Sequence, residues 1–454
     1  MKRNKKNDIY IYYERTSRRR RKRRSKTLFG IIIVVLLAVG VGLVTTYVVG
    51  FRMGFGNPLN QKDADLRDEE SKDDIVYQAD NTETPTPPII PDNDIVSDET
   101  IIDSDIDEVA IEIDNRVPVE VKGIYVTSKA IRNKSLELIE IADTTEINAM
   151  VIDVKDDNGR ITFEMDSPLA QEIGATTNTI SDMEAFIRQL REKDIYPIAR
   201  IVAFKDPYLA EQRHDLAIKN KDGSLYRDNG GECWVNPYER EVWDYLIEVS
   251  IKAAEIGFME IQFDYIRFST GKGMSEVDFG PLSAEKSKED IIIEFTKYAY
   301  ESLKPLGVFV SADVYGTIIS SSIDAGLVGQ NYVEMSKYLD YICPMIYPSH
   351  FGHGNYGIEY PDLEPLVIVR KVLHASKTNL EQIPQGEHKA IVRPWLQDFT
   401  ATWITPHQVY GGKELREQID GVYAAGYKEW LLWDASCNYS VDGLEKEWIN
   451  YSSY

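Results

Sequence analysis

Two aspartates stand where the sequence could support acid–base chemistry. Asp264 and Asp313 each end an apolar run, a setting in which an unpaired carboxylate is costly. Side-chain alternation along a strand places Glu260, Gln262 and Asp264 on one face. Because neighbouring strands lie about 4.8 Å apart, carboxylates at adjacent strand ends can approach to about 5–5.5 Å. At that separation their pKa values move apart, so one group can serve as an acid and the other as a nucleophile.

Three further acids fall at or just past the ends of strand-like runs. They are Asp153, Asp398 and Asp434. A single aspartate at such a place is a weak signal, because it also suits the N-cap of a helix. A structural role for the first two aspartates is equally open, with both of them paired to arginines at the rim of the fold. The arginines available for such pairs are Arg200, Arg267 and Arg393.

Aromatic residues gather near the same strand ends and favour a binding function. They are Trp234, Tyr265, Tyr315, Tyr347, Trp395, Trp403 and Trp433. Aromatic faces beside carboxylates and amides suit sugar rings, which have an apolar face and a hydroxyl edge. Packing in the core is the alternative for any one of them. We expect Tyr347 and Trp395 to stack on a substrate, and Trp234 to contact it.

The elements that would position these residues follow a regular alternation from about residue 119. Short β-rich runs alternate with amphipathic helical stretches, which predicts a parallel sheet. Eight such runs over roughly 336 residues indicate an α/β fold, a (β/α)₈ TIM-type barrel. A doubly wound open sheet is the rival, but no G-x-G-x-x-G follows the first run. The strand-like runs are 123–127, 149–154, 196–203, 259–263, 308–312, 341–345, 390–395 and 430–433, and the helical stretches lie near 135–145, 182–193, 238–256, 288–304, 332–339, 365–378 and 414–425.

The connections between these elements have unequal lengths. Helix-to-strand turns are short, whereas the strand-to-helix connections include long βα-loop insertions. The long ones are 204–237, 268–287, 346–364 and 396–413. Long loops therefore gather at the rim formed by the C-terminal ends of the strands, where barrel enzymes place their sites.

The N-terminal part of the chain predicts a membrane anchor. The formal net charge is −23, yet residues 1–27 hold 13 Lys or Arg against two acids, so the rest sums to about −34 by subtraction. Residues 28–49 carry no charge and are long enough to cross a membrane as one helix. Lys and Arg stay inside, so we expect a cytoplasmic tail at 1–27, a single-pass helix at 28–49, and the remainder outside the cell. A long, cleaved signal peptide is the alternative.

A linker is expected between the helix and the barrel. Residues 50–118 are acidic, contain prolines and have few aromatics, a composition that predicts disorder. The barrel domain is assigned to residues 119–454. So acidic an ectodomain repels nucleic acid, which leaves the membrane, through residues 28–49, and a substrate as the expected partners. The sequence does not predict an oligomeric state.

No metal or cofactor site is expected. The three cysteines, Cys233, Cys343 and Cys437, are odd in number and form no CxxC pair, so neither a disulfide framework nor a zinc site is indicated. His350 and His353 lie in a glycine-rich loop, where loop structure or substrate contact is a better interpretation than a metal pair. No HExxH, P-loop, GxSxG or EF-hand pattern occurs.

Four motifs carry a resemblance to a known family. They are Lys-Gly-Ile-Tyr-Val-Thr from 122, Val-Ile-Asp-Val-Lys-Asp-Asp-Asn-Gly from 151, Ile-Gln-Phe-Asp-Tyr-Ile-Arg-Phe from 261 and Ser-Ala-Asp-Val-Tyr-Gly from 311. Over about residues 120–450 the chain resembles the putative glycoside hydrolase domain family of Gram-positive bacteria, distantly similar to α-amylase-like barrels.

The resemblance implies roles for individual residues. It matches Asp264 to the nucleophile that ends strand 4 and Asp313 to the acid/base group that ends strand 5, with Asp398 a loose match for a third acid. The sequence departs from the α-amylase-like pattern in two places. That acid is usually Glu, and an Arg usually stands where this chain has Gln262.

The sequence and the resemblance together predict a membrane-anchored extracellular glycosidase. We expect it to cleave a cell-wall or extracellular polysaccharide through Asp264 and Asp313. The expected substrate-binding residues are Asp153, Arg200, Trp234, Gln262, Arg267, Tyr347, Trp395, Asp398 and Asp434. A non-catalytic carbohydrate-binding barrel, which tethers or senses wall polymers, is the first alternative. An envelope scaffold with a large exposed apolar patch is the second.

Overall fold

The computed structural model describes residues 114–445 of the chain. The expected cytoplasmic tail, the expected membrane helix at 28–49 and most of the expected linker lie outside these residues. Between residues 114 and 445, no helix is long and apolar enough to span a membrane.

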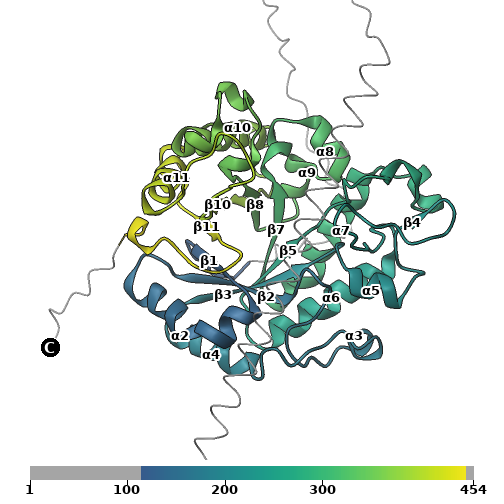
Figure 1. Cartoon of the computed structure of the whole chain (residues 1–454). Helices are drawn as coiled ribbons and strands as arrows, with labels where there is room; N and C mark the ends of the chain where they lie inside the picture. Colours follow the sequence, from purple (N-terminus) through teal and green to yellow (C-terminus); the bar gives the residue numbers. More distant parts are fainter. Residues whose placement is uncertain (1–113, 446–454) are drawn as a thin grey trace, which may run out of the picture. The chain divides into compact units, whose positions relative to one another are not determined.

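A closed barrel of parallel strands forms the centre of the described part (Figure 1). Its strands are β1 (Lys122–Val126), β2 (Ala149–Lys155), β3 (Tyr196–Val202), β5 (Glu260–Asp264), β7 (Phe309–Tyr315), β8 (Tyr341–Met345), β9 (Ile391–Val392), β10 (Trp395–Gln397) and β11 (Trp430–Trp433). The hydrogen-bonded order is β10-β11-β1-β2-β3-β5-β7-β8-β9, and a further parallel pairing of β10 with β8 closes the ring. The predicted TIM-type barrel is confirmed.

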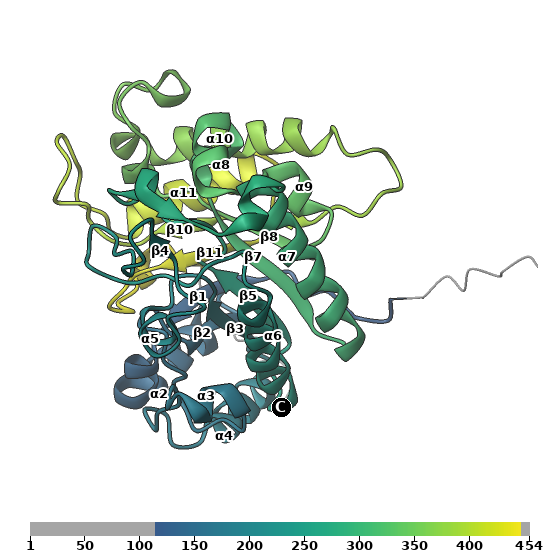
Figure 2. The ribbon, with the colours of Figure 1, turned by 90° about the vertical axis from the view of Figure 1, so that its right-hand side faces the viewer.

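The helices surround this barrel. They are α2 (Ser128–Thr144), α3 (Pro168–Glu172), α4 (Met183–Glu192), α5 (Pro207–Gln212), α6 (Arg240–Glu255), α7 (Lys288–Leu303), α8 (Ser322–Val328), α9 (Tyr332–Ser336), α10 (Pro365–Leu380) and α11 (Gly412–Ala424). In Figures 1 and 2, α2 and α4 lie on one side of the strands and α10 and α11 on the opposite side. The short α3, α5 and α8 were not predicted, because five to seven residues show too little periodicity.

The seventh strand position differs from the expected run 390–395. Pro394 divides it into β9, which pairs with β8, and β10, which pairs with β11 and β8. Proline has no backbone N–H to donate, so it interrupts the ladder at this point. Trp395 keeps the register of the run, since it pairs with Met345 just as Val392 pairs with Ile342, and its indole contacts the carboxyl of Asp313.

The long strand-to-helix connections gather at one rim, as predicted. Two of them are tied together by a small antiparallel pairing between β4 (Lys219–Asn220) and β6 (Val277–Asp278). At the opposite rim, Arg116 donates hydrogen bonds to the carbonyl of Val308 and to both oxygens of Asp340. Residue 116 belongs to the expected linker, and here it is attached beside the N-terminal ends of the strands.

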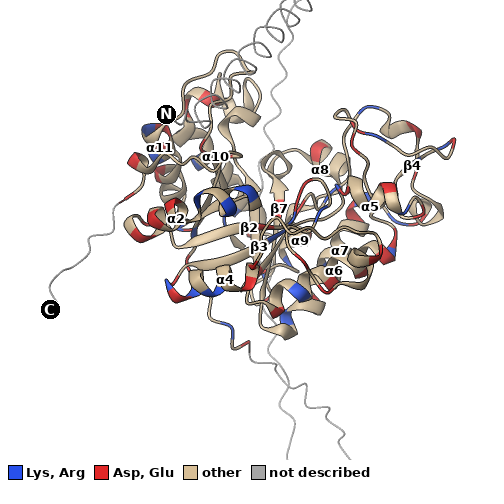
Figure 3. Ribbon diagram, turned by 60° about the horizontal axis from the view of Figure 1, so that its bottom comes forward, with Lys and Arg blue, Asp and Glu red and all other residues tan. Residues whose placement is uncertain are grey.

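Apolar residues fill the space between strands and helices, while charge stays outside. Figure 3 shows acidic and basic residues on the outer helices and few on the strands. Some charged groups are buried on the strands, and one such cluster lies inside the barrel, where Arg393 donates to Glu260 at 2.8 Å and to Glu429 at 2.8 Å. Both Arg393 and Glu260 are fully buried. This lower layer closes the barrel beneath the site.

Candidate functional site

A cavity of about 420 Å³ opens at the C-terminal rim of the barrel. Residues on or just after β3, β5, β7, β8, β10 and β11 contribute to its wall. They are Arg200, Asp264, Tyr265, Arg267, Asp313, Tyr315, Gly316, Thr317, Met345, Tyr347, His350, Phe351, Trp395 and Trp433. Both expected catalytic aspartates therefore line one cavity, as their places in the sequence predicted.

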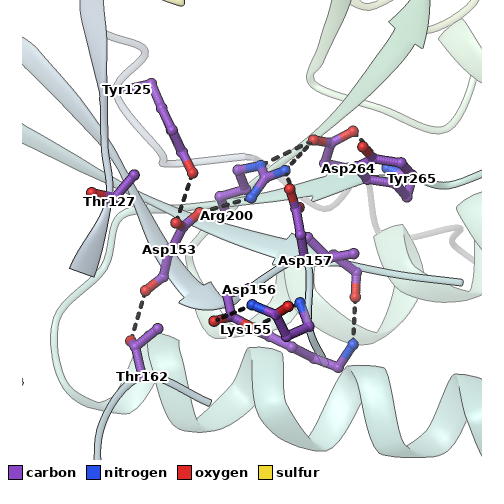
Figure 4. Close-up of polar contacts among 12 residues, drawn as sticks. Tyr125, Thr127, Asp153, Lys155, Asp156, Asp157, Thr162, Arg200, Asp264 and Tyr265 are labelled. Atoms are coloured by element: carbon purple, nitrogen blue, oxygen red, sulfur yellow. Dashed lines mark hydrogen bonds and ion pairs between the residues drawn. The ribbon is translucent and has the colours of Figure 1, made fainter. Parts of the chain in front are cut away.

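Arg200 organises the acids on one side of this cavity (Figure 4). Its Nε and Nη2 donate to Asp264 Oδ2 at 3.0 and 2.6 Å, and its Nη1 donates to Asp153 Oδ1 at 2.7 Å. Nη2 also pairs with Asp157 at 2.8 Å. The Asp264 side chain is consequently fixed by two charge-assisted hydrogen bonds to one of its oxygens, which are stronger than neutral ones.

The position of Arg200 explains the departure at Gln262. The register of β3 with β5 pairs Arg200 with Gln262 and Val202 with Asp264. A guanidinium from the neighbouring strand thus reaches Asp264, although Gln262 stands where an arginine was expected on the same strand. Gln262 is fully buried and donates to Cys343 Sγ at 3.4 Å, beneath the cavity wall.

Asp313 has a different environment from Asp264. It is 3 % exposed, and Oδ1 accepts a hydrogen bond from Trp395 Nε1 at 2.6 Å. Burial raises the pKa of Asp313 well above its ordinary value, the negative charge of Asp264 raises it further, and the Trp395 hydrogen bond partly opposes both. Oδ2 accepts no hydrogen bond from the described residues, yet it is not one of the polar atoms that are buried without a partner. It is therefore exposed to the cavity.

The positions of the two aspartates follow directly from the register of adjacent strands. Phe263 of β5 pairs with Ala312 of β7, and Asp264 and Asp313 are the next residue on each strand. The backbone then turns sharply after Asp264. Tyr265 has a φ of 49°, an unusual conformation for an aromatic residue, and its N–H donates to Asp264 Oδ1 at 2.6 Å. Both oxygens of Asp264 are held.

Asp153 supports Arg200 from behind. It accepts hydrogen bonds from Arg200 and, at 2.7 Å, from the hydroxyl of Tyr125. Burial raises the pKa of Asp153 to about 6, against the opposing charge of Arg200. Tyr125 in turn stacks on Trp433, with ring centroids 4.1 Å apart. Asp153 does not line the cavity, so its place is to orient Arg200.

Four other expected substrate-binding residues also lie outside the cavity wall. Trp234 is buried and donates to Asp228 at 2.9 Å. Asp398 accepts from the N–H and hydroxyl of Ser440, and Asp434 accepts from two backbone N–H groups of its own loop. Gln262 lies beneath the cavity wall, where it contacts Cys343. The site brings together Arg200, Arg267, Tyr347 and Trp395 with the two aspartates.

Trp395 has a contact that the sequence did not reveal. We expected a stacking face, but its ring is 1 % exposed and meets Trp433 edge-on, with centroids 5.7 Å apart. Its polar edge is the group that contacts Asp313. This orientation follows the ordinary alternation of a strand, in which Arg393 and Trp395 both point into the barrel.

Several residues of the wall were not singled out from the sequence. Gly316, Thr317, Met345 and Phe351 have no distinctive residue type, and only their places after β7 and β8 could have indicated them. A Cβ at Gly316 would lie 2.5 Å from the carbonyl oxygen of Met345, so the close approach requires glycine. His350 lines the cavity, in agreement with a substrate contact, and burial lowers its pKa. Among residues 114–445, no three His, Cys, Asp or Glu side chains are arranged to hold a metal.

An aromatic path continues the cavity outward along the loop after β10. Tyr347 and His350 contact the edge or face of Phe399, with centroids 5.8 and 6.3 Å away. Phe399 stacks nearly parallel to Trp403, which is 67 % exposed. The indole of Trp403 is therefore largely open to solvent at the outer end of this path.

Known proteins support the fold and identify the family. The glycoside hydrolase domain of PgaB (BpsB) from Bordetella bronchiseptica is 13 % identical over 70 % of this chain and 95 % of its own, with a TM-score of 0.50. At that identity it shows the fold alone. A hypothetical protein from Ruminiclostridium thermocellum is 38 % identical over 42 % of this chain and 97 % of its own, with a TM-score of 0.39. No curated protein sequence matches the chain significantly.

The family model agrees with the geometry of the barrel. The model described as "putative glycosyl hydrolase domain" matches residues 123–439, which include the barrel strands from the second residue of β1 onward and every residue of the cavity wall. The chain therefore belongs to the putative glycosyl hydrolase domain family, as its four sequence motifs indicated.

Proposed function

We propose that the barrel is a glycoside hydrolase that cleaves a cell-wall or extracellular polysaccharide, with Asp264 as nucleophile and Asp313 as general acid and base. The observation that carries this proposal is the contrast between two carboxyls in one cavity. Three N–H donors converge on Asp264, whereas burial and the charge of Asp264 favour a proton on Asp313. An anion beside an acid is what double displacement at a sugar requires.

The first step forms a covalent intermediate. Asp264 attacks the anomeric carbon while the bond to the leaving oxygen breaks and Asp313 gives its proton to that oxygen. The proton resides on Oδ2, because Oδ1 already accepts from Trp395. In the second step Asp313, now a carboxylate, takes a proton from water, and the water oxygen displaces Asp264. Both side chains return to their starting states, and this chemistry requires no cofactor.

The surrounding residues position these two groups. Arg200 fixes the Asp264 carboxylate, and Asp153 with Tyr125 fixes Arg200. Trp395 orients Asp313. Tyr347 lines the cavity beside them and supplies an aromatic face for a sugar ring.

We also propose that residues 28–49 anchor the barrel in a membrane, with residues 1–27 in the cytoplasm and the barrel outside. Support comes from the charge asymmetry and from the uncharged 22-residue segment. Arg116, at the end of the expected stalk, is attached at the rim opposite the cavity. An anchor joined there would leave the cavity open to the polymer. Protease treatment of intact cells should remove the barrel but leave the basic tail protected.

Turnover by variants tests the catalytic proposal. The full chain is screened against wall and capsular polysaccharides, with released products detected by mass. We expect Asp264→Asn, which removes the nucleophile, and Asp313→Asn, which removes the acid and base, each to lose at least about 100-fold in turnover. The control is Asp420→Asn on the exposed face of α11. Near-normal turnover by Asp264→Asn would refute the assignment, and binding without turnover by the unaltered chain would favour the non-catalytic carbohydrate-binding barrel.

A further inference from the structure

Arg267 is a buried cation in the cavity wall with no anionic partner among the described residues. Its side chain belongs to a residue that is only 8 % exposed, and no carboxylate of residues 114–445 pairs with it. Arg200, the other arginine of the wall, is paired with three acids. An arginine guanidinium is not deprotonated in proteins, so this side chain carries its positive charge. Burial of an unpaired charge is costly, so a compensating group is expected.

Aromatic rings compensate for only part of this charge. The guanidinium carbon lies 5.0 Å from the ring centroid of Trp234, 4.9 Å from that of Tyr265 and 4.7 Å from that of Tyr315. Rings attract the cation but are weak acceptors for its N–H groups. They hold the guanidinium in place against the cavity.

The N–H donors of Arg267 are largely unused. Nη1 donates to the carbonyl of Phe268 at 3.0 Å, and this is the one hydrogen bond of the side chain to other described residues. Nε and Nη2 of Arg267 are not among the polar atoms that are buried without a partner. Both nitrogens are therefore accessible to solvent. Because Arg267 lines the cavity, these donors are available to a bound ligand.

The proposed reaction makes an uncompensated cation unfavourable at this place. The sugar at the point of cleavage gains positive charge in the transition state, and Asp264 is the anion that stabilises it. A second, unpaired positive charge in the same cavity opposes that development. An anionic group on the substrate would pair with Arg267 and remove the conflict, and the guanidinium fork matches the two oxygens of such a group.

We propose that Arg267 binds an acidic group of the substrate, so that the cavity takes an anionic sugar, in particular one that carries a carboxylate. The inference rests on the proposed function and names its substrate class. Sulfated sugars share the oxyanion chemistry and form a separate arm of the test.

The test compares acidic oligosaccharides with their own neutral forms. Uronate-containing and muramic-acid-containing tetrasaccharides are used before and after reduction of their carboxylates, and sulfated ones before and after desulfation. Affinity for the full chain in mild detergent is measured by calorimetry for the unaltered protein and for Arg267→Gln. Asp264→Asn serves as the background, so that turnover does not interfere.

The expected result is a loss of about 10- to 100-fold in affinity for an acidic probe on Arg267→Gln, with no change for its reduced form. Arg240→Gln is the matched control, because Arg240 also lies over aromatic rings but on an exposed helix face. The basic residues 1–27 are present in every variant, so only the difference between variants counts. Arg267→Lys keeps the charge and should retain part of the preference if the glutamine variant folds poorly.

Two results would overturn the inference. One is an acidic preference in Arg267→Gln equal to that of the unaltered chain. The other is no acidic probe that binds better than its neutral form. The outcome is separable from that of the proposed function, since turnover of a neutral glycan alone would refute the acidic substrate and keep the hydrolase. Acid-selective binding without turnover would keep the acidic ligand and refute the hydrolase.

Discussion

Replacement of Arg200 by glutamine tests how strongly the ion-pair cluster at the site stabilises the fold. The guanidinium is 1 % exposed and serves Asp153, Asp157 and Asp264 at 2.6–2.8 Å. Loss of this side chain leaves two largely buried carboxylates, Asp153 and Asp264, without their cation. Removal of one partner from a buried ion pair costs about 3–5 kcal/mol. Asp157, whose side chain is 43 % exposed, adds less than about 1 kcal/mol.

We therefore expect Arg200→Gln to lower the free energy of unfolding by about 3–5 kcal/mol at pH 7, measured by urea denaturation with tryptophan fluorescence. Arg213→Gln is the control, because Arg213 also pairs with two carboxylates, Asp215 and Glu241, but at the surface. That variant should lose less than about 1 kcal/mol. Equal losses in the two variants would refute the argument from burial.

The pH dependence of this loss has a definite sign. Without Arg200 the buried carboxylates take up protons more readily in the folded state than in the unfolded state, which raises their folded-state pKa values. A group of that kind stabilises the fold increasingly as pH falls. The difference between Arg200→Gln and the unaltered chain should shrink from pH 7 toward pH 5, across the pKa of about 6 at which Asp153 already titrates. A difference in the free energy of unfolding that is constant or larger at pH 5 would contradict the role given to the ion-pair cluster.

Three further predictions concern the acid, the aromatic path and the packing of the outer helices. Trp395→Phe removes the N–H that lowers the pKa of Asp313, so the alkaline limb of kcat/KM should move to higher pH, because the acid must be protonated to act; an unmoved limb would point to another acid. Trp403→Ala should raise KM for a polymer about 2- to 10-fold but leave that for a short aryl glycoside unchanged, since the exposed ring lies beyond the cavity; equal effects on both substrates would place the ring elsewhere in the binding path. Gly421→Ala on α11 should destabilise the fold by about 1–3 kcal/mol in denaturant titrations, because its Cβ would lie 2.8 Å from the Leu366 carbonyl oxygen. Gly326→Ala on α8 meets nothing closer than 3.8 Å and should stabilise by up to about 1 kcal/mol; the opposite order would show that these contacts do not limit packing.

The barrel and its working rim could be predicted because they follow from local patterns. Eight strand-like runs alternate with seven helical stretches, the loops between them differ in length, and each of these patterns is visible within a few residues. Asp264 and Asp313 were found by the same means, since each ends a run and the runs are neighbours. The α3, α5 and α8 helices, which are shorter than two full turns, escaped because their periodicity is too brief.

The contacts within the site depend on register and therefore could not be predicted. The alignment of β3 with β5 brings Arg200 to Asp264, although 64 residues separate them. The indole of Trp395 on β10 meets the carboxyl of Asp313 on β7, which is not an adjacent strand, and this contact takes the ring away from a stacking role. That Arg267 has no carboxylate partner among residues 114–445 is evident only when the acids around it have been placed in space. A sequence contains the candidates for such pairs, and the fold selects among them.

The most direct test of the central claim is detection of a glycosyl group on Asp264. Asp313→Asn slows the second step, because the base that activates water is missing, while an aryl glycoside with a good leaving group still permits the first. The variant is mixed with an aryl glycoside of the sugar identified by the screen, quenched in acid, digested and analysed by mass spectrometry. We predict one added glycosyl unit on the peptide that contains Asp264 and none in the Asp313→Asn, Asp264→Asn double variant. An adduct on another carboxylate, or steady turnover by the double variant, would contradict the account.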